Sequence, residues 1–166
     1  VPNFQGIEMN SSTSERPNIL LFVTDGWQAR TLSDGHDCKT PTIDGLIERG
    51  VRITGAHTTL PTCSPARASL MTGLFPHNHG VLEVEHGVDP DQCVLRTEHP
   101  HWAQRLRESG YDTGYFGKWH LGDEISAQHG FERWISIEEN YRSYYSKPED
   151  LECFSDYHHF LVENGF

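Results

Sequence analysis

A cysteine and an arginine lie one helical turn apart in the stretch from Pro61 to Gly73, which reads PTCSPARASLMTG. Its early proline and final glycine predict a short helix with Cys63 at or next to the N-cap. The first N–H groups of a helix lack intrahelical partners and the dipole there is positive, so an anion can bind. Arg67 follows Cys63 by four residues and reaches the same place. A lone Cys-x-x-x-Arg pattern, however, more often marks a buried cysteine beside a surface arginine.

A second group of reactive side chains lies between Tyr111 and Gly122, in the string YDTGYFGKWHLG. Alternation in its first half predicts a strand that ends at Gly117. Lys118 and His120 are two residues apart, so in an extended backbone their side chains point the same way. A cation beside an imidazole suits the binding and protonation of a leaving oxyanion. A bare pair of this kind is more often simply exposed to solvent.

A carboxylate ends the apolar run from Pro17 to Asp25, PNILLFVTD. A continuous apolar run is typical of a strand buried on both faces of a parallel sheet. Ligand sites in such sheets lie beyond the carboxyl ends of the strands, which is where Asp25 falls. The alternative is a simple turn at Asp25-Gly26.

Proline, glycine and apolar patterns in the sequence also predict the helices and strands that would position these groups. We expect residues 28–39 to form a turn-rich loop. Residues 138–147, which include Tyr141, are expected to form a surface segment that lines the mouth of the site. The remaining elements are a helix from Pro41 to Gly50, a strand from Val51 to His57, a helix from Pro100 to Gly110, and an amphipathic helix from Pro148 to Asn164.

Length and charge exclude several classes of protein. The 166 residues allow one domain, and a net charge of −11 argues against a nucleic-acid partner. No apolar run reaches membrane-spanning length, and no signal peptide is visible. Residues 1–15 are polar and predict a flexible N-terminal tail. The compartment and the oligomeric state stay unknown. The four cysteines show neither metal-ribbon spacing nor a disulfide framework: Cys38, Cys63, Cys93 and Cys153.

The string from Cys63 to Gly73 resembles the sulfatase signature C-x-P-x-R-x-x-x-L/M-T-G, and the string from Gly110 to His120 resembles the family's second signature. The resemblance covers about residues 16 to 134. It implies an α/β fold of the alkaline phosphatase-like type, with three α/β/α layers and a mostly parallel sheet. Residues 16–166 would then form the N-terminal part of a sulfatase catalytic domain. The chain would be a truncated, partial enzyme, because further metal ligands of the family come from residues beyond this stretch.

The resemblance also implies roles for the site residues. In the family, a formylglycine-generating enzyme oxidises the residue matching Cys63, and the hydrated aldehyde is the nucleophile. Asp25 and residue 63 would bind a divalent cation, usually Ca²⁺, with Mg²⁺ or Mn²⁺ as alternatives. Arg67 would steady the hydrate, Lys118 would bind the sulfate, and His120 would contact the hydrate or the sulfate. Many sulfatases have a second aspartate where this chain has Gly26.

Two other functions remain open. One is phosphonate monoester or phosphodiester hydrolysis in the same superfamily, whose enzymes tend to lack the matching lysine and histidine. The other is a non-catalytic fragment that acts as a binding module. The substrate of a sulfatase could be a small sulfate ester or a sulfated glycan, and the sequence does not separate these.

Overall fold

The computed structural model describes residues 16–32, 35–137 and 141–166, so the expected tail at residues 1–15 lies outside the described part. The chain divides into two compact units, Val1–Val51 and Arg52–Phe166. No described helix has the length and apolar character that crossing a membrane would require.

The described residues of the first unit form a 3-10 helix, η1 (Ala29–Leu32), and the α-helix α1 (Pro41–Arg49). The α1 prediction is confirmed at both ends, with proline in the first position and Gly50 as the C-cap. Thr40 Oγ1 donates a hydrogen bond to Asp44 Oδ1 over 2.9 Å, which stabilises the first turn.

The predicted strands at residues 17–25 and 51–57 are wrong, because the structure has no strand there. Their apolar side chains are exposed, with 83% of Phe22 and 91% of Val51 accessible to solvent. A strand needs hydrogen-bonded neighbours. Among the described residues, the paired strands are β1 and β2 of the second unit.

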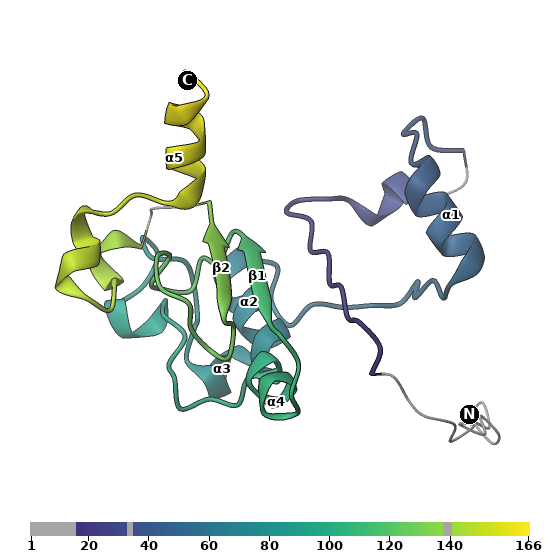
Figure 1. The fold of residues 1–166 in the computed structure, drawn as a ribbon. Coiled ribbons are helices and arrows are strands. Elements are labelled where there is room, and N and C mark those ends of the chain that lie inside the picture. The colour runs from purple at the N-terminus through teal and green to yellow at the C-terminus, as the bar shows by residue number, and fades with distance from the viewer. Residues whose placement is uncertain (1–15, 33–34, 138–140) are drawn as a thin grey trace. The chain divides into compact units, whose positions relative to one another are not determined.

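The second unit is built on a parallel pair of strands, β1 (Gly114–Gly117) and β2 (Arg133–Ser136), as Figure 1 shows. Gly114 lies opposite Arg133 and Gly117 lies opposite Ser136. The predicted end of the strand at Gly117 is therefore confirmed, and the fold is α/β with a parallel sheet. The helices are α2 (Cys63–Thr72), α3 (Pro76–His79), α4 (Trp102–Glu108) and α5 (Asp156–Glu163), with 3-10 turns η2 (Pro90–Gln92), η3 (Arg142–Tyr144) and η4 (Pro148–Glu152).

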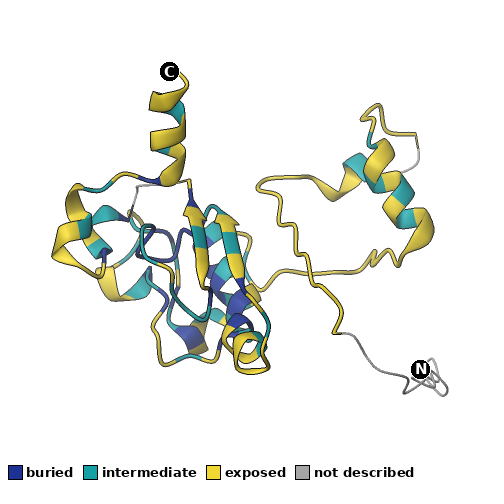
Figure 2. Cartoon of the chain, viewed as in Figure 1, coloured by how far each residue is buried: buried dark blue, intermediate teal, exposed yellow. Residues whose placement is uncertain are grey.

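The core of the second unit lies where α2 packs against α3 and α4, and α2 contributes buried residues to it (Figure 2). Trp119 is fully buried and meets the rings of Tyr115 and Trp134 edge-on, each with centroids 5.2 Å apart. Because Trp119 stands between Lys118 and His120 in the sequence, its burial fixes the backbone of both. The cluster comprises Ala68, Met71, Val81, Leu95, Ala103, Trp119, Leu121 and Phe131.

Helix α4 approaches the turn before β2 closely. Gly130 has a φ of +93°, and a Cβ there would lie 2.3 Å from backbone atoms of Gln104. Thr113 Oγ1 donates to the Gly130 carbonyl over 2.6 Å and holds this turn against the start of β1. Only glycine fits this position.

Two predictions near the C-terminus are wrong. The single helix predicted from Pro148 to Asn164 is broken into η4 and α5, because Ser155 starts a new helix by accepting the His158 N–H. The segment predicted to lie on the surface, residues 138–147, is described only from Tyr141 onward. There Tyr141 is fully buried and Tyr145 is 8% exposed.

Candidate active site

Cys63 is the first residue of α2, directly after the N-cap Thr62. The predicted placement at the helix start is thus confirmed. The helix has ten residues, and Gly73 ends it in the left-handed conformation with its N–H bonded to the Ser69 carbonyl over 2.8 Å. Cys63 is half-buried and has a free thiol. The side chain therefore lies at the positive end of the α2 dipole.

Arg67 attaches α2 to the segment that carries Lys118. Its Nη1 donates to the Lys118 carbonyl over 2.6 Å and lies 3.3 Å from the Tyr115 hydroxyl. The same hydroxyl donates to the Lys118 carbonyl. The guanidinium thus fixes the point where the chain leaves β1, one helical turn from Cys63.

His120 lies in a tight turn, and the expectation of an extended backbone is wrong at this residue. Its φ is +61°, a left-handed value that is uncommon outside glycine. The His120 N–H donates to Glu124 Oε1 over 2.7 Å, and this buried carboxylate stabilises the turn. Lys118 and His120 are therefore both placed by hydrogen bonds and by Trp119 between them, but not by strand alternation.

Tyr141 joins His120 to the start of α2, whereas the sequence placed it only in a surface segment at the mouth of the site. Its hydroxyl lies 2.9 Å from Ser64 Oγ and accepts the Glu85 N–H over 3.2 Å. Its ring meets the His120 ring edge-on, with centroids 5.1 Å apart at 81°. Burial is the main cause that raises the pKa of Tyr141 to about 12, so the hydroxyl stays neutral near pH 7.

Four of the five predicted site residues therefore belong to the second unit, and the structure links them in one network. Cys63 and Arg67 lie on α2, Arg67 contacts Lys118, and the neighbour of Cys63 contacts His120 through Tyr141. Asp25 lies in the first unit, at an exposed bend next to Gly26. Its binding of a cation together with residue 63 stays a prediction. Within the described ranges, no group of three histidine, cysteine or acidic residues is arranged to hold a metal.

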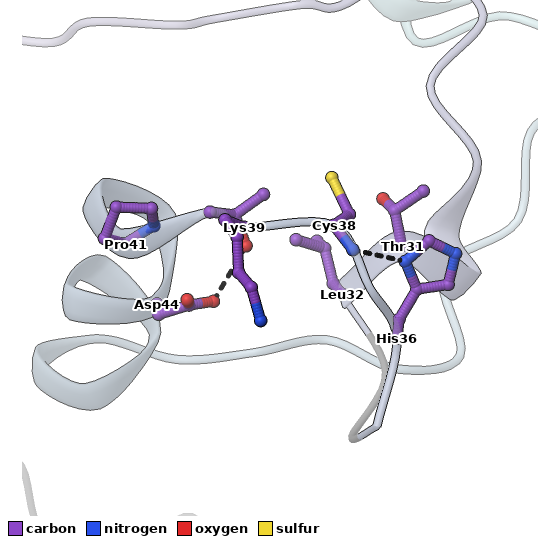
Figure 3. Close-up of a pocket in the computed structure, with 8 residues that line it drawn as sticks. Thr31, Leu32, His36, Cys38, Lys39, Pro41 and Asp44 are labelled. Atoms are coloured by element: carbon purple, nitrogen blue, oxygen red, sulfur yellow. Dashed lines mark hydrogen bonds between the residues drawn. The ribbon is translucent and has the colours of Figure 1, made fainter.

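The first unit has a pocket of about 520 Å³ beside α1 (Figure 3). His36 Nδ1 accepts the Cys38 N–H over 3.0 Å, which supports the interpretation of this loop as a turn. The lining residues are Thr31, Leu32, His36, Cys38, Lys39, Thr40, Pro41 and Asp44.

Comparison with known proteins gives the same assignment as the sequence motifs. The sulfatase family model matches residues 17–162. The ulvan-active sulfatase of Formosa agariphila is 35% identical over 132 residues, which are 74% of this chain and 24% of that protein. Arylsulfatase A of Bos taurus is 35% identical over 151 residues, which are 83% of this chain and 28% of that protein.

Relatives also include the N-acetylglucosamine-6-O-sulfatase of Bacteroides thetaiotaomicron, 29% identical over 92% of this chain and 25% of its own length. Among solved structures, the sulfatase yidJ of Bacteroides fragilis matches with a TM-score of 0.50 and 30% identity, over 59% of this chain and 26% of that one. The chain spans about a quarter of the length of these relatives. On the extent of the family match, this chain belongs to the sulfatase family.

Proposed function

We propose that this chain carries the nucleophile and part of the sulfate-binding site of a sulfuric ester hydrolase. The nucleophile is a formylglycine made from Cys63 by a formylglycine-generating enzyme. The observation that supports this most directly is the network that joins the start of α2 to Lys118 through Arg67 and to His120 through Tyr141. This network connects the two family signatures, which supports their forming one site.

Several groups of the second unit would contribute to anion binding, each in a different way. The N-terminus of α2 and the Lys118 ammonium neutralise the charge on the sulfate oxygens. Arg67 holds Lys118 by its carbonyl. It lies one helical turn from residue 63, which it would steady. His120 contacts the sulfate or the nucleophile and can move a proton to the leaving oxygen.

We infer that residue 63 can bind a divalent cation only after Cys63 is oxidised. Ca²⁺, Mg²⁺ and Mn²⁺ prefer oxygen ligands, which the Asp25 carboxylate provides and the Cys63 thiol does not. Oxidation gives residue 63 the oxygen donors that such a cation requires. When bound, the cation would supply Lewis-acid stabilisation of negative charge.

We further propose that these 166 residues alone form a partial enzyme, since they span about a quarter of the relatives' length. The isolated chain is then expected to release sulfate far more slowly than a complete sulfatase. The names of the relatives, which include a sulfatase active on ulvan and a sulfatase of N-acetylglucosamine, favour a sulfated glycan as the substrate.

The test compares the hydrolysis of an aryl sulfate with that of an aryl phosphonate. The assay uses the full-length protein, co-produced with a formylglycine-generating enzyme. We expect a preference for the sulfate that Lys118→Ala reduces, because the ammonium binds the sulfate group. A preference for the phosphonate would instead favour the phosphonate or phosphodiester hydrolases. No turnover of either ester, with residue 63 still a thiol, would favour a binding module.

A further inference from the structure

The hydroxyl and the ring of Tyr141 contact two different parts of the site. The hydroxyl lies 2.9 Å from Ser64 Oγ, and both side chains are fully buried. Ser64 directly follows Cys63 in the first turn of α2. Any change at the Tyr141 hydroxyl therefore acts on the turn that carries the nucleophile.

The hydrogen bonds of this hydroxyl leave it little freedom. A tyrosine hydroxyl has one proton to donate and also accepts hydrogen bonds. It accepts from the Glu85 N–H over 3.2 Å, so backbone outside both signatures fixes its position. The contact with Ser64 then transmits this position to α2.

The ring of Tyr141 faces the other half of the site. Its edge-on contact with the His120 imidazole, at 5.1 Å and 81°, restricts the plane of that ring. The backbone of His120 is held separately by Glu124, through a hydrogen bond of 2.7 Å. Backbone and ring of His120 are thus fixed by two different residues.

Resting on the function proposed above, we propose that Tyr141 is a positioning residue that sets residue 63 and His120 at a defined angle to each other. It does so through one hydrogen bond to Ser64 and one ring contact to His120. It lies 77 positions after Ser64 and in neither signature. It acts as a neutral group and supplies orientation, whereas Arg67 and Lys118 supply charge.

The test uses the 166-residue chain with the thiol of Cys63 intact, so that its readouts do not depend on turnover. The alkylation rate of Cys63 by iodoacetamide is followed by mass spectrometry of the peptide 53–67. Tyr141→Phe keeps the ring but releases Ser64, and we expect alkylation about fivefold faster, the effect of one lost hydrogen bond. Tyr141→Leu removes the ring as well and is expected to shift the His120 imidazole resonance, which Tyr141→Phe leaves in place.

Matched controls distinguish a positioning role of Tyr141 from a general destabilisation of the second unit. Thr113→Val removes a buried hydrogen bond of the same unit, the 2.6 Å contact with Gly130, without touching α2. It is expected to leave both readouts unchanged. Ser64→Ala removes the other partner of the hydrogen bond between Ser64 and Tyr141. It tests the proposal even where the tyrosine variants fail to fold. In combination with Tyr141→Phe, it should add nothing further to the alkylation rate.

Three results would overturn the proposal: equal alkylation rates for the parent and Ser64→Ala, equal acceleration by Thr113→Val, or additive effects of the two single changes. Failure of the proposed function is distinguishable from these results. It would appear as an unmodified residue 63 after co-production with the formylglycine-generating enzyme. The alkylation rate and the His120 resonance still measure the coupling in that case.

Discussion

Acid is expected to unfold the second unit through two stacked histidines, His101 and His129. His101 is 2% exposed, and its ring lies 5.2 Å from that of His129. Burial, together with the neighbouring His129, lowers the pKa of His101 to about 3, from an ordinary 6.5. Burial is also the main cause that lowers the pKa of His129 to about 4. Both rings are therefore neutral in the folded chain at pH values where they are charged in the unfolded chain.

The sign and size of the effect follow from proton linkage. Above about pH 6.5 neither state binds these protons, so the free energy of unfolding does not change through them. Between about 6.5 and 4 the unfolded chain takes up protons that the folded chain excludes. Each histidine then lowers the free energy of unfolding by up to ~1.4 kcal/mol per pH unit. Two give up to ~2.7 kcal/mol per unit, less any solvent screening at the half-buried His129.

The assay is urea unfolding at intervals between pH 7.5 and 5, followed by tryptophan fluorescence, on the parent and on a His101→Asn/His129→Asn variant. Asparagine preserves the local backbone at both sites. At position 101 it can still cap α4, where His101 Nδ1 accepts the Ala103 N–H over 3.3 Å. At position 129 it tolerates the φ of +51°.

The variant is expected to be less stable at pH 7.5, because it loses packing, but its stability should fall much less steeply below pH 6.5. Carboxylates titrate in both proteins and cancel in the comparison. Parallel curves for the two proteins would contradict a role of these histidines, since the acid sensitivity would then come from other groups.

Three further substitutions test contacts of the second unit. Gly130→Ala places a Cβ 2.3 Å from the backbone of Gln104 at a φ of +93°, and urea unfolding should show a loss of at least ~2 kcal/mol. Asp123→Ala removes the acceptor of three backbone N–H groups and is expected to lower the free energy of unfolding by about 2–4 kcal/mol. Arg67→Lys cannot reproduce the guanidinium contact with the Lys118 carbonyl at 2.6 Å, so we expect a loss of about 1 kcal/mol and weaker sulfate binding by calorimetry.

Glu108→Gln serves as the common control for these three. It weakens the exposed pair with Arg105, whose atoms are 3.0 Å apart, and should change stability by less than ~0.5 kcal/mol. A Gly130→Ala or Asp123→Ala protein as stable as this control would contradict the packing described for the turns. Unchanged sulfate affinity in Arg67→Lys would contradict the role given to its contact with Lys118.

Local signals in the sequence predicted the helices that position the site. Proline and glycine mark both ends of α1, and the same signals placed Cys63 at the start of α2. Gly117 correctly marked the end of β1. These features depend on residues within one or two turns of each other, which is why a single sequence reveals them.

Features that depend on distant partners were not predictable in this way. The apolar run at residues 17–25 has the composition of a buried strand, but composition does not supply the neighbour that a strand needs. Tyr141 looks like its neighbour Tyr144 in the sequence, and its burial follows from contacts with Ser64 and Glu85 far along the chain. The left-handed backbone of His120 likewise depends on the carboxylate of Glu124.

Mass spectrometry of the tryptic peptide 53–67, after co-production with a formylglycine-generating enzyme, shows whether residue 63 is oxidised. We predict an aldehyde or its hydrate at residue 63, while Cys38, Cys93 and Cys153 stay thiols. A Pro65→Ala variant, which breaks the signature, should keep the thiol at residue 63 as well. If residue 63 of the parent chain is alkylated as completely as the other three cysteines, it carries no oxidised nucleophile and the proposed function is contradicted.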